Sequence, residues 1–135
     1  MSPAADEFVA RHPRSVLITH RGDGGLQASP VRVLRDDDGR IVATSRATTA
    51  KVRNIARDPR VALCVLDDAW QGPWMTIEGE AEILGMPGAL SQLAAFYRQR
   101  DGSLPEAAEF QATMEAEERV LLVIHSRREA GTALR

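Results

Sequence analysis

The chain has 135 residues, of which 44% are apolar and 27% charged, the size and composition of one globular domain with its own core. Its net charge of −2 and its 4% aromatic content argue against a protein that binds nucleic acid through its surface. No apolar stretch approaches the ~20 residues of a membrane span. Residues 1–7 lack the features of a signal peptide, so we expect a cytoplasmic protein.

Short apolar segments alternate with turns rich in glycine and aspartate in the N-terminal part of the chain. Turns at residues 22–25 and 36–39 separate three predicted strands and indicate two consecutive antiparallel hairpins. Pro30 lies inside the second strand and cannot donate to a ladder, which predicts an edge, a bulge or a break there. The elements predicted in this part are a helix over 4–11 and strands over 15–20, 26–35 and 40–45.

A helical pattern starts at Thr48, where apolar residues recur on one side of a helix that ends at Asp58-Pro59. The strand expected over 60–67 is apolar on both faces, as in the centre of a sheet. Its Cys64 is the single cysteine, which fits a reducing compartment. We interpret Cys64 as a small core residue, because no neighbouring base supports the alternative of a reactive thiol.

The segment 74–83 has the longest alternation of apolar and polar residues in the chain, which predicts a strand. The acidic side chains on one face indicate a solvated surface rather than a catalytic pair. These polar positions are Thr76, Glu78, Glu80 and Glu82. The remaining predicted elements are helices over 87–100 and 105–117 and a strand over 119–124.

Six strands, mostly in hairpins and flanked by helices, predict a closed or nearly closed antiparallel β-barrel, a mainly β (α+β) fold. No internal repeat or linker divides the chain, so we expect a single domain over residues 1–135. The polar residues 126–135 are expected to form a loose tail.

The segment from Thr44 to Asn54 carries most of the chemical information. A strand end, a turn rich in hydroxyl groups and a helix start follow one another, and free backbone N–H groups at a helix N-terminus favour phosphate. Lys51 and Arg53 lie on opposite flanks of this helix and can approach an anion from two sides. Further donors come from the hydroxyl groups of Ser45, Thr48 and Thr49.

A second interpretation of this segment stays open. Thr48 can serve as a helix cap and the basic side chains can form a solvated face, with no ligand. Arg57, a full turn after Arg53, is expected to be a surface or salt-bridge residue in either case.

Other chemistries have little support in the sequence. His12, His20 and His125 are scattered and lack metal-ligand spacing, so no metal site is predicted. No nucleophile motif or phosphate-binding glycine loop is present, and no catalytic side chain is predicted. This pattern is typical of a protein whose cofactor performs the reaction. Trp70 and Trp74 flank a Gly-Pro loop and can cover a planar ligand, join a subunit interface or plug a barrel end.

Residues 48–63, TTAKVRNIARDPRVAL, resemble the helix-and-strand signature of the pyridoxamine 5'-phosphate oxidase-like split-barrel family. More narrowly, they resemble the branch that uses the deazaflavin coenzyme F420. The segments 27–31 and 74–81 agree in order and spacing, so the resemblance extends over residues 8–125.

The resemblance implies a six-stranded antiparallel split β-barrel of the FMN-binding type with flanking helices. It also implies a homodimer with two cofactor sites at the subunit interface. The cofactor phosphate would lie near Thr49, Ala50, Lys51 and Arg53. The ring would lie against Ser29, Pro30, Val31, Thr44 and Ser45. Trp74 would come from the opposite subunit or line the substrate pocket.

The same resemblance implies an oxidoreductase that transfers a hydride to or from a conjugated small molecule. Coenzyme F420 is favoured by the Ala-Lys-x-Arg-Asn pattern, with flavin mononucleotide (FMN) as the alternative. Some relatives carry an arginine where this chain has Thr49, and Arg46 is the substitute we consider. Pyridoxamine phosphate oxidation is not expected, because the oxidases' substrate-binding C-terminal segment is not found in this sequence.

Two other classes of function stay open. A carrier that binds a flavin, a deazaflavin or haem without turnover needs no catalytic side chain either. A nucleic-acid-binding or structural barrel is weakly compatible with the clustered basic residues.

Overall fold

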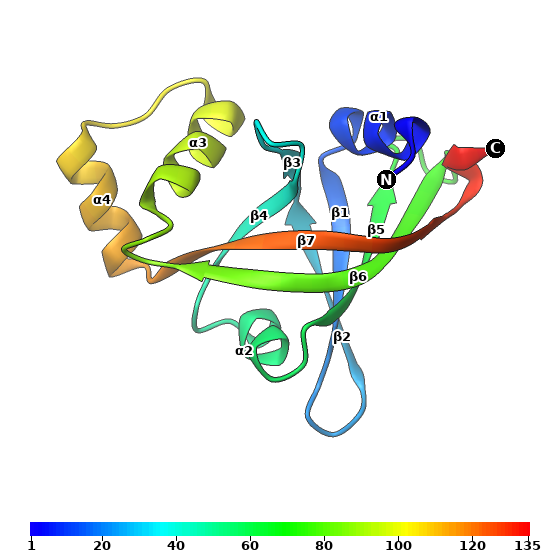
Figure 1. The fold of residues 1–135 in the computed structure, drawn as a ribbon, viewed down its shortest axis with the longest axis horizontal. Coiled ribbons are helices and arrows are strands. Elements are labelled where there is room, and N and C mark those ends of the chain that lie inside the picture. Colours follow the sequence, from blue (N-terminus) through cyan, green and yellow to red (C-terminus); the bar gives the residue numbers. More distant parts are fainter.

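Residues 1–135 are all described by a computed structural model, in which one curled antiparallel sheet carries helices at its sides and ends (Figure 1). The elements are α1 (Pro3–Arg11), β1 (Arg14–His20), β2 (Leu26–Arg32), β3 (Leu34–Arg35), β4 (Ile41–Arg46), α2 (Ala50–Arg57), β5 (Arg60–Leu66), β6 (Trp74–Gly85), α3 (Leu90–Asp101), α4 (Ala107–Ala116), β7 (Arg119–Ala130) and the 3-10 helix η1 (Thr132–Leu134). The strand order is β2-β1-β5-β6-β7-β4-β3, with β2 and β3 at the two ends of an open sheet.

The sheet has seven strands rather than the predicted six, because the second predicted strand divides at Val33. The Val33 side chain is buried and its backbone N–H donates to the Pro13 carbonyl at 2.8 Å, so this residue leaves the ladder. Pro30 lies in β2, opposite Val16 of β1, and β2 is an edge strand. The edge position expected for this proline is therefore confirmed.

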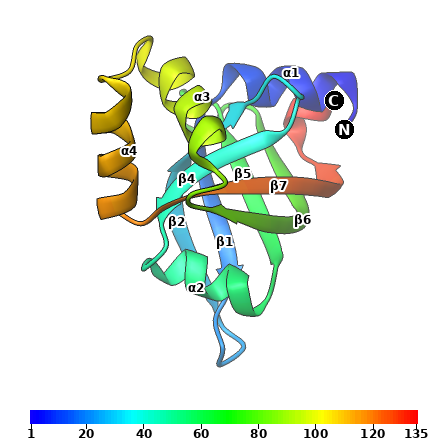
Figure 2. The same cartoon turned by 60° about the vertical axis from the view of Figure 1, so that its left-hand side comes forward.

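Two apolar cores lie on opposite sides of β4 and β7. The larger core fills the inside of the curl and includes Ile41 and Ala43 of β4 together with residues of α1 and α2. The smaller core joins Val42 of β4 to Phe96 of α3 and Phe110 of α4. Successive residues of a strand point to opposite faces, so β4 serves both cores. Figure 2 shows α4 at the side of the sheet and apart from α2, and Figure 1 shows α3 and α4 together at the opposite end of the molecule from α1.

The C-terminal residues correct the expectation of a loose tail. β7 continues to Ala130, and η1 follows it. The exposed glutamates of β6 face basic residues of this extension, with Glu80 3.9 Å from Arg127 and Glu78 3.4 Å from Arg128. The acidic face of β6 is thus a solvated strand face, as predicted. Its negative charges pair with arginines of the C-terminal segment that was predicted to be a loose tail.

The outer face of β1 and β5 is apolar and belongs to neither core. Val16 and Ile18 of β1 lie opposite Cys64 and Ala62 of β5, and all four are half-buried. Cys64 is therefore not a core residue, because β5 points Val61, Leu63 and Val65 into the core and Cys64 away from it. None of the helices combines the length and the apolar composition of a membrane span.

Candidate functional site

The first turn of α2 exposes backbone donors that no protein group uses. Thr49, rather than Thr48, is the N-cap, because its carbonyl accepts the first helical bond, from the Arg53 N–H at 3.1 Å. The N–H and the hydroxyl of Thr49 both donate to the Arg46 carbonyl, at 3.2 and 3.0 Å. The Thr49 hydroxyl also lies 3.1 Å from the Ser45 hydroxyl and does not cap the helix. The N–H groups of Ala50, Lys51 and Val52 consequently have no protein partner, which is the condition for anion binding at a helix start.

Lys51 is the only lysine of the chain and is half-buried beside these donors. It makes no ion pair and no side-chain hydrogen bond, whereas most of the other basic residues are paired. Burial lowers the pKa of Lys51, and the neighbouring positive charge of Arg119 lowers it further. A partly buried cation with a like charge as its neighbour is the group that an anion would stabilise most.

The other predicted phosphate ligands surround the same turn. Arg53 is exposed and folds back, donating to the Thr48 carbonyl at 3.1 Å. Arg46 ends β4 and has an exposed side chain. Thr44 points to the opposite face of β4 from Ser45 and donates its hydroxyl to the Val120 carbonyl at 3.1 Å. Thr44 therefore lies on the other face of β4 from Ser45, which contacts Thr49 at the start of α2.

A buried polar chain fixes α2 against the sheet. The amide of Asn54 donates to the Thr19 hydroxyl at 3.0 Å, and Thr19 in turn donates to the Gln27 side chain at 3.3 Å. Arg57 donates to Asn54 and to the His20 carbonyl, at 2.9 and 3.1 Å. Asn54 and Arg57 of the helix motif thus position α2. Arg57 is exposed, donates to neutral groups and forms no salt bridge.

The residues predicted to face the cofactor ring do not share one surface. Ser29 and Val31 point to the inside of the curl, where Ser29 lies opposite Leu17, whereas Pro30 points outward. The Ser29 hydroxyl is inaccessible to solvent and has no hydrogen-bond partner. An unpartnered buried hydroxyl on the edge strand is an unused polar group for a ligand.

Trp74 lies far from Lys51 in the same chain. It begins β6, whose 12 residues span roughly 36 Å at about 3.3 Å per residue, and the far end of β6 lies beside Val120, next to Arg119. Figure 1 shows β6 crossing the molecule from the C-terminal segment toward α3. Trp70 is 93% exposed and Trp74 40% exposed, so neither indole plugs the barrel.

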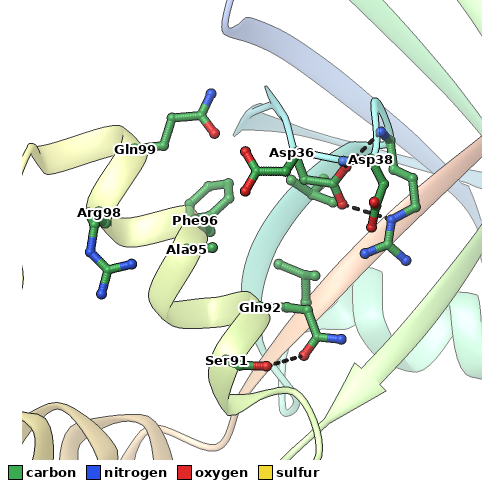
Figure 3. A pocket seen from close by; sticks show the side chains of 12 residues that line it. Asp36, Asp38, Ser91, Gln92, Ala95, Phe96, Arg98 and Gln99 are labelled. Carbon is green, nitrogen blue, oxygen red and sulfur yellow. Dashed lines mark hydrogen bonds and ion pairs between the residues drawn. The ribbon is translucent and has the colours of Figure 1, made fainter.

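A cavity of about 500 Å³ lies away from this turn, between the β3–β4 hairpin and α3 (Figure 3). Four of its polar side chains are paired with one another: Asp36 accepts from Arg40 at 2.7 Å, and Ser91 donates to Gln92 at 3.2 Å. None of the predicted site residues lines it. We therefore place the candidate site at the start of α2, where the donors lack partners.

Two charged residues of this site, Glu117 and Arg119, were missed by the sequence analysis. Arg119 lies opposite Arg46 in the pairing of β4 with β7, and its Nε donates to Glu117 at 2.7 Å. Their separation from Arg46 by more than 70 residues concealed this proximity. The only signal in the sequence was the run of charges at 115–119. No group of three or more histidine, cysteine or acidic residues is arranged to hold a metal ion.

An open curled antiparallel sheet, with a helix start and an unpaired lysine at one end, defines a protein of the split-barrel class. The family described as pyridoxamine 5'-phosphate oxidase matches residues 1–129, and the chain belongs to this family.

Several solved structures share the fold over nearly the whole chain. A conserved hypothetical protein from Mycobacterium tuberculosis is 26% identical with a TM-score of 0.78, over 99% of this chain and 88% of that protein. An F420 reductase is 24% identical with a TM-score of 0.69, over 93% of this chain and 94% of its own. The haem storage protein HutZ of Vibrio cholerae is 15% identical with a TM-score of 0.73, over 96% of this chain and 92% of its own.

Proposed function

We propose that the chain is an oxidoreductase that binds coenzyme F420 and transfers a hydride between this cofactor and a conjugated small molecule. The observation that carries the proposal is Lys51, a half-buried cation without a counter-ion, next to three free N–H groups of α2. Together these groups form a site for one phosphate. FMN carries a phosphate too, and is the alternative cofactor.

The residues present fit a phosphate-bearing flavin-type group. The N–H groups of Ala50, Lys51 and Val52, with the Lys51 ammonium and the exposed Arg53, would hold the phosphate. Ser29 on β2 offers a hydroxyl without a partner, and α2 contacts β2. The bound cofactor would supply the hydride, while the chain's own residues bind and orient it and exclude water. The F420 preference rests on the Ala-Lys-x-Arg-Asn pattern and is consistent with an F420 reductase of the same fold.

A homodimer is part of this proposal. The half-buried Val16, Ile18, Ala62 and Cys64 form an apolar sheet face that no core of the chain covers. A second copy would remove this face from water, in agreement with the preference of such surfaces for protein partners. Because Trp74 and Lys51 lie far apart within one chain, Trp74 would contribute to the cofactor site of the partner subunit.

Equilibrium binding, followed by fluorescence titration with F420 and with FMN in parallel, tests this proposal. Tight binding of F420 and weak binding of FMN is the expected result. The reverse order would assign the chain to FMN, and binding of neither would overturn the redox function.

A carrier function is the second candidate, because HutZ, a haem storage protein, has the same fold. The test is oxidation of the reduced, bound cofactor by a panel of enones, quinones and tetrapyrroles. Turnover with any member supports an oxidoreductase. Inertness toward all of them, with cofactor binding intact, would favour the carrier.

A further inference from the structure

Arg119 brings an additional cation to Lys51 from a distant part of the chain. It begins β7 and lies opposite Arg46 of β4, and its side chain is only 23% exposed. One carboxylate serves both arginines: Glu117 lies 2.7 Å from Arg119 and 3.8 Å from Arg46. Around the start of α2 there are thus four basic side chains, and Glu117 is the acid that pairs with two of them. The four are Arg46, Lys51, Arg53 and Arg119.

The backbone fixes this arrangement. Glu118 has a φ of 51°, in the left-handed region that non-glycine residues seldom adopt. Its carbonyl accepts the Ala47 N–H at 2.8 Å, which ties the α4–β7 turn to the β4–α2 turn. The two turns pass side by side in Figure 1. Glu117 and Arg119, on either side of Glu118, are therefore held beside Arg46 and Lys51.

A cavity gives solutes access to Arg119 and Glu117. These two residues line a space of about 270 Å³ between α3, α4 and the start of β7. Pockets that enclose a whole small ligand usually measure about 300–1,000 Å³, so this cavity is large enough for only part of one. Of the two arginines that line it, Arg100 pairs with Asp101 at 2.8 Å and Arg119 pairs with Glu117 at 2.7 Å. Lys51 does not line this cavity, but Arg119 is the charged neighbour that acts on it.

We propose that Arg119 is a second cationic binding residue for the anion held at the start of α2, and that Glu117 is the counter-ion which this anion displaces. The inference rests on the proposed phosphate site. In the free protein, Glu117 partly neutralises Arg119 and Arg46, but it leaves Lys51 without a partner. A phosphate has enough oxygens for Lys51, for the helix N–H groups and for the guanidinium of Arg119.

The charges show which group competes with the incoming anion. The hydrogen bond from Arg119 holds the pKa of Glu117 below its usual value, and the charges of Arg119 and Arg46 add to this effect. Glu117 therefore stays ionised at neutral pH and competes with an incoming anion for Arg119. The positive charge of Arg119 acts on Lys51, and Glu117 is the acid that pairs with both Arg119 and Arg46.

Binding of F420 to matched variants tests the inference. Arg119→Gln is expected to lower the affinity about tenfold or more, as loss of a charge-assisted hydrogen bond does. Glu117→Gln keeps the shape but removes the competing charge, and is expected to raise the affinity several-fold. Arg98→Gln is the control, because Arg98 is exposed and makes no ion pair. If Arg119→Gln binds F420 as the wild type does, or Glu117→Gln binds it more weakly, the inference is wrong.

Acetylation of the sole lysine supplies a second readout, to be measured on variants that unfold at the wild-type temperature, because unfolding would itself raise the pKa of Lys51. The neutral amine reacts, so the pH dependence of Lys51 labelling, followed by peptide mass spectrometry, gives its pKa. We expect Arg119→Gln to raise this pKa and to slow labelling at a fixed pH, and inorganic phosphate to protect Lys51 less well in the variant. Unchanged labelling and protection would overturn the role of Arg119. A loss of F420 binding in Lys51→Met but not in Arg119→Gln would refute this inference alone, whereas full binding in Lys51→Met would refute the proposed site.

Discussion

Arg46 at the end of β4 lies directly opposite Arg119 at the start of β7, and a single carboxylate, Glu117, contacts both side chains. The pair brings two like charges together at the point where the chain turns into α2. Like charges on facing strand positions destabilise a sheet unless a counter-charge is present. The proposed anion site explains why these two arginines lie next to Lys51 and the free N–H groups of α2.

The first prediction concerns Lys51. Lys51→Ala is expected to leave the unfolding temperature unchanged, because this side chain is not part of the core, and to weaken F420 binding. The loss of a charge-assisted bond predicts a decrease in affinity of roughly 10- to 100-fold, to be measured by fluorescence titration. Arg60→Ala is the control, since Arg60 is an exposed cation that pairs with Asp58 at 2.7 Å. Equal affinities in the two variants would remove Lys51 from the site.

A second prediction tests the apolar sheet face. Ile18→Glu introduces a charge at the centre of this face and should convert a dimer into a monomer in sedimentation velocity experiments. Ala108→Glu, on the exposed side of α4, is the control and should leave the mass unchanged. A wild-type protein that sediments as a monomer at all concentrations would contradict the homodimer.

The buried chain around Asn54 should contribute to stability rather than to binding chemistry. Asn54→Ala leaves the hydroxyl of Thr19, which is fully buried, without its donor. Loss of a buried hydrogen-bond partner lowers the free energy of unfolding by about 1–3 kcal/mol. Arg57→Ala keeps the bond between Asn54 and Thr19 and should have a smaller effect. Urea unfolding distinguishes the two variants, and an equal loss in both would count against the assigned order.

Gly79 is required by the close approach of β6 and β7. A Cβ at this position would collide with the backbone carbonyl of His125 at the register shift between Glu78 and Gly79. Gly79→Ala is therefore expected to lower the unfolding temperature strongly, because backbone atoms of both strands must move. Gly85→Ala, at the last residue of β6, meets open space and should change the free energy of unfolding by less than about 0.5 kcal/mol. The unfolding temperatures of both variants test this prediction, and equal values would contradict it.

The carboxyl group of Asp58 gives a prediction for pH. The hydrogen bond from the Arg60 side chain, and then that from the Arg60 N–H, lower the pKa of Asp58 from 3.8 to about 2. Because the folded value lies below the unfolded one, ionised Asp58 stabilises the fold above the unfolded value, and this contribution is lost as the pH falls toward 2. In Arg60→Gln, the carboxyl titration observed by NMR should move up toward 3.8. A midpoint that does not move would show that Arg60 is not the cause.

Local patterns were sufficient to predict most of the elements. Turns at 22–25 and 36–39 gave the hairpins, because glycine and aspartate favour the backbone angles that such turns need. The alternation over 74–83 predicted both the strand and its solvated acidic face, since side chains in a strand alternate between two faces. The free donors at the start of α2 were likewise predictable, because any helix leaves its first N–H groups unpaired.

Long-range pairing decided what the patterns could not. Residues 126–130 have no apolar alternation of their own, and they form a strand because their backbone pairs with residues 76–79 of β6. The cap moved from Thr48 to Thr49 because the turn closes on the Arg46 carbonyl. Cys64 lies outside the cores because the sheet stays open and leaves one face of β5 uncovered.

The sequence by itself thus determined the hairpins, the helices and the cation at the start of α2, since these depend on neighbours within a few residues. Only the tertiary structure decided that Arg119 and Glu117 join Lys51, and that Trp74 lies at the opposite end of β6. The physical reason is the pairing of β4 with β7, which brings residues more than 70 positions apart into contact through backbone hydrogen bonds. No local periodicity encodes that register.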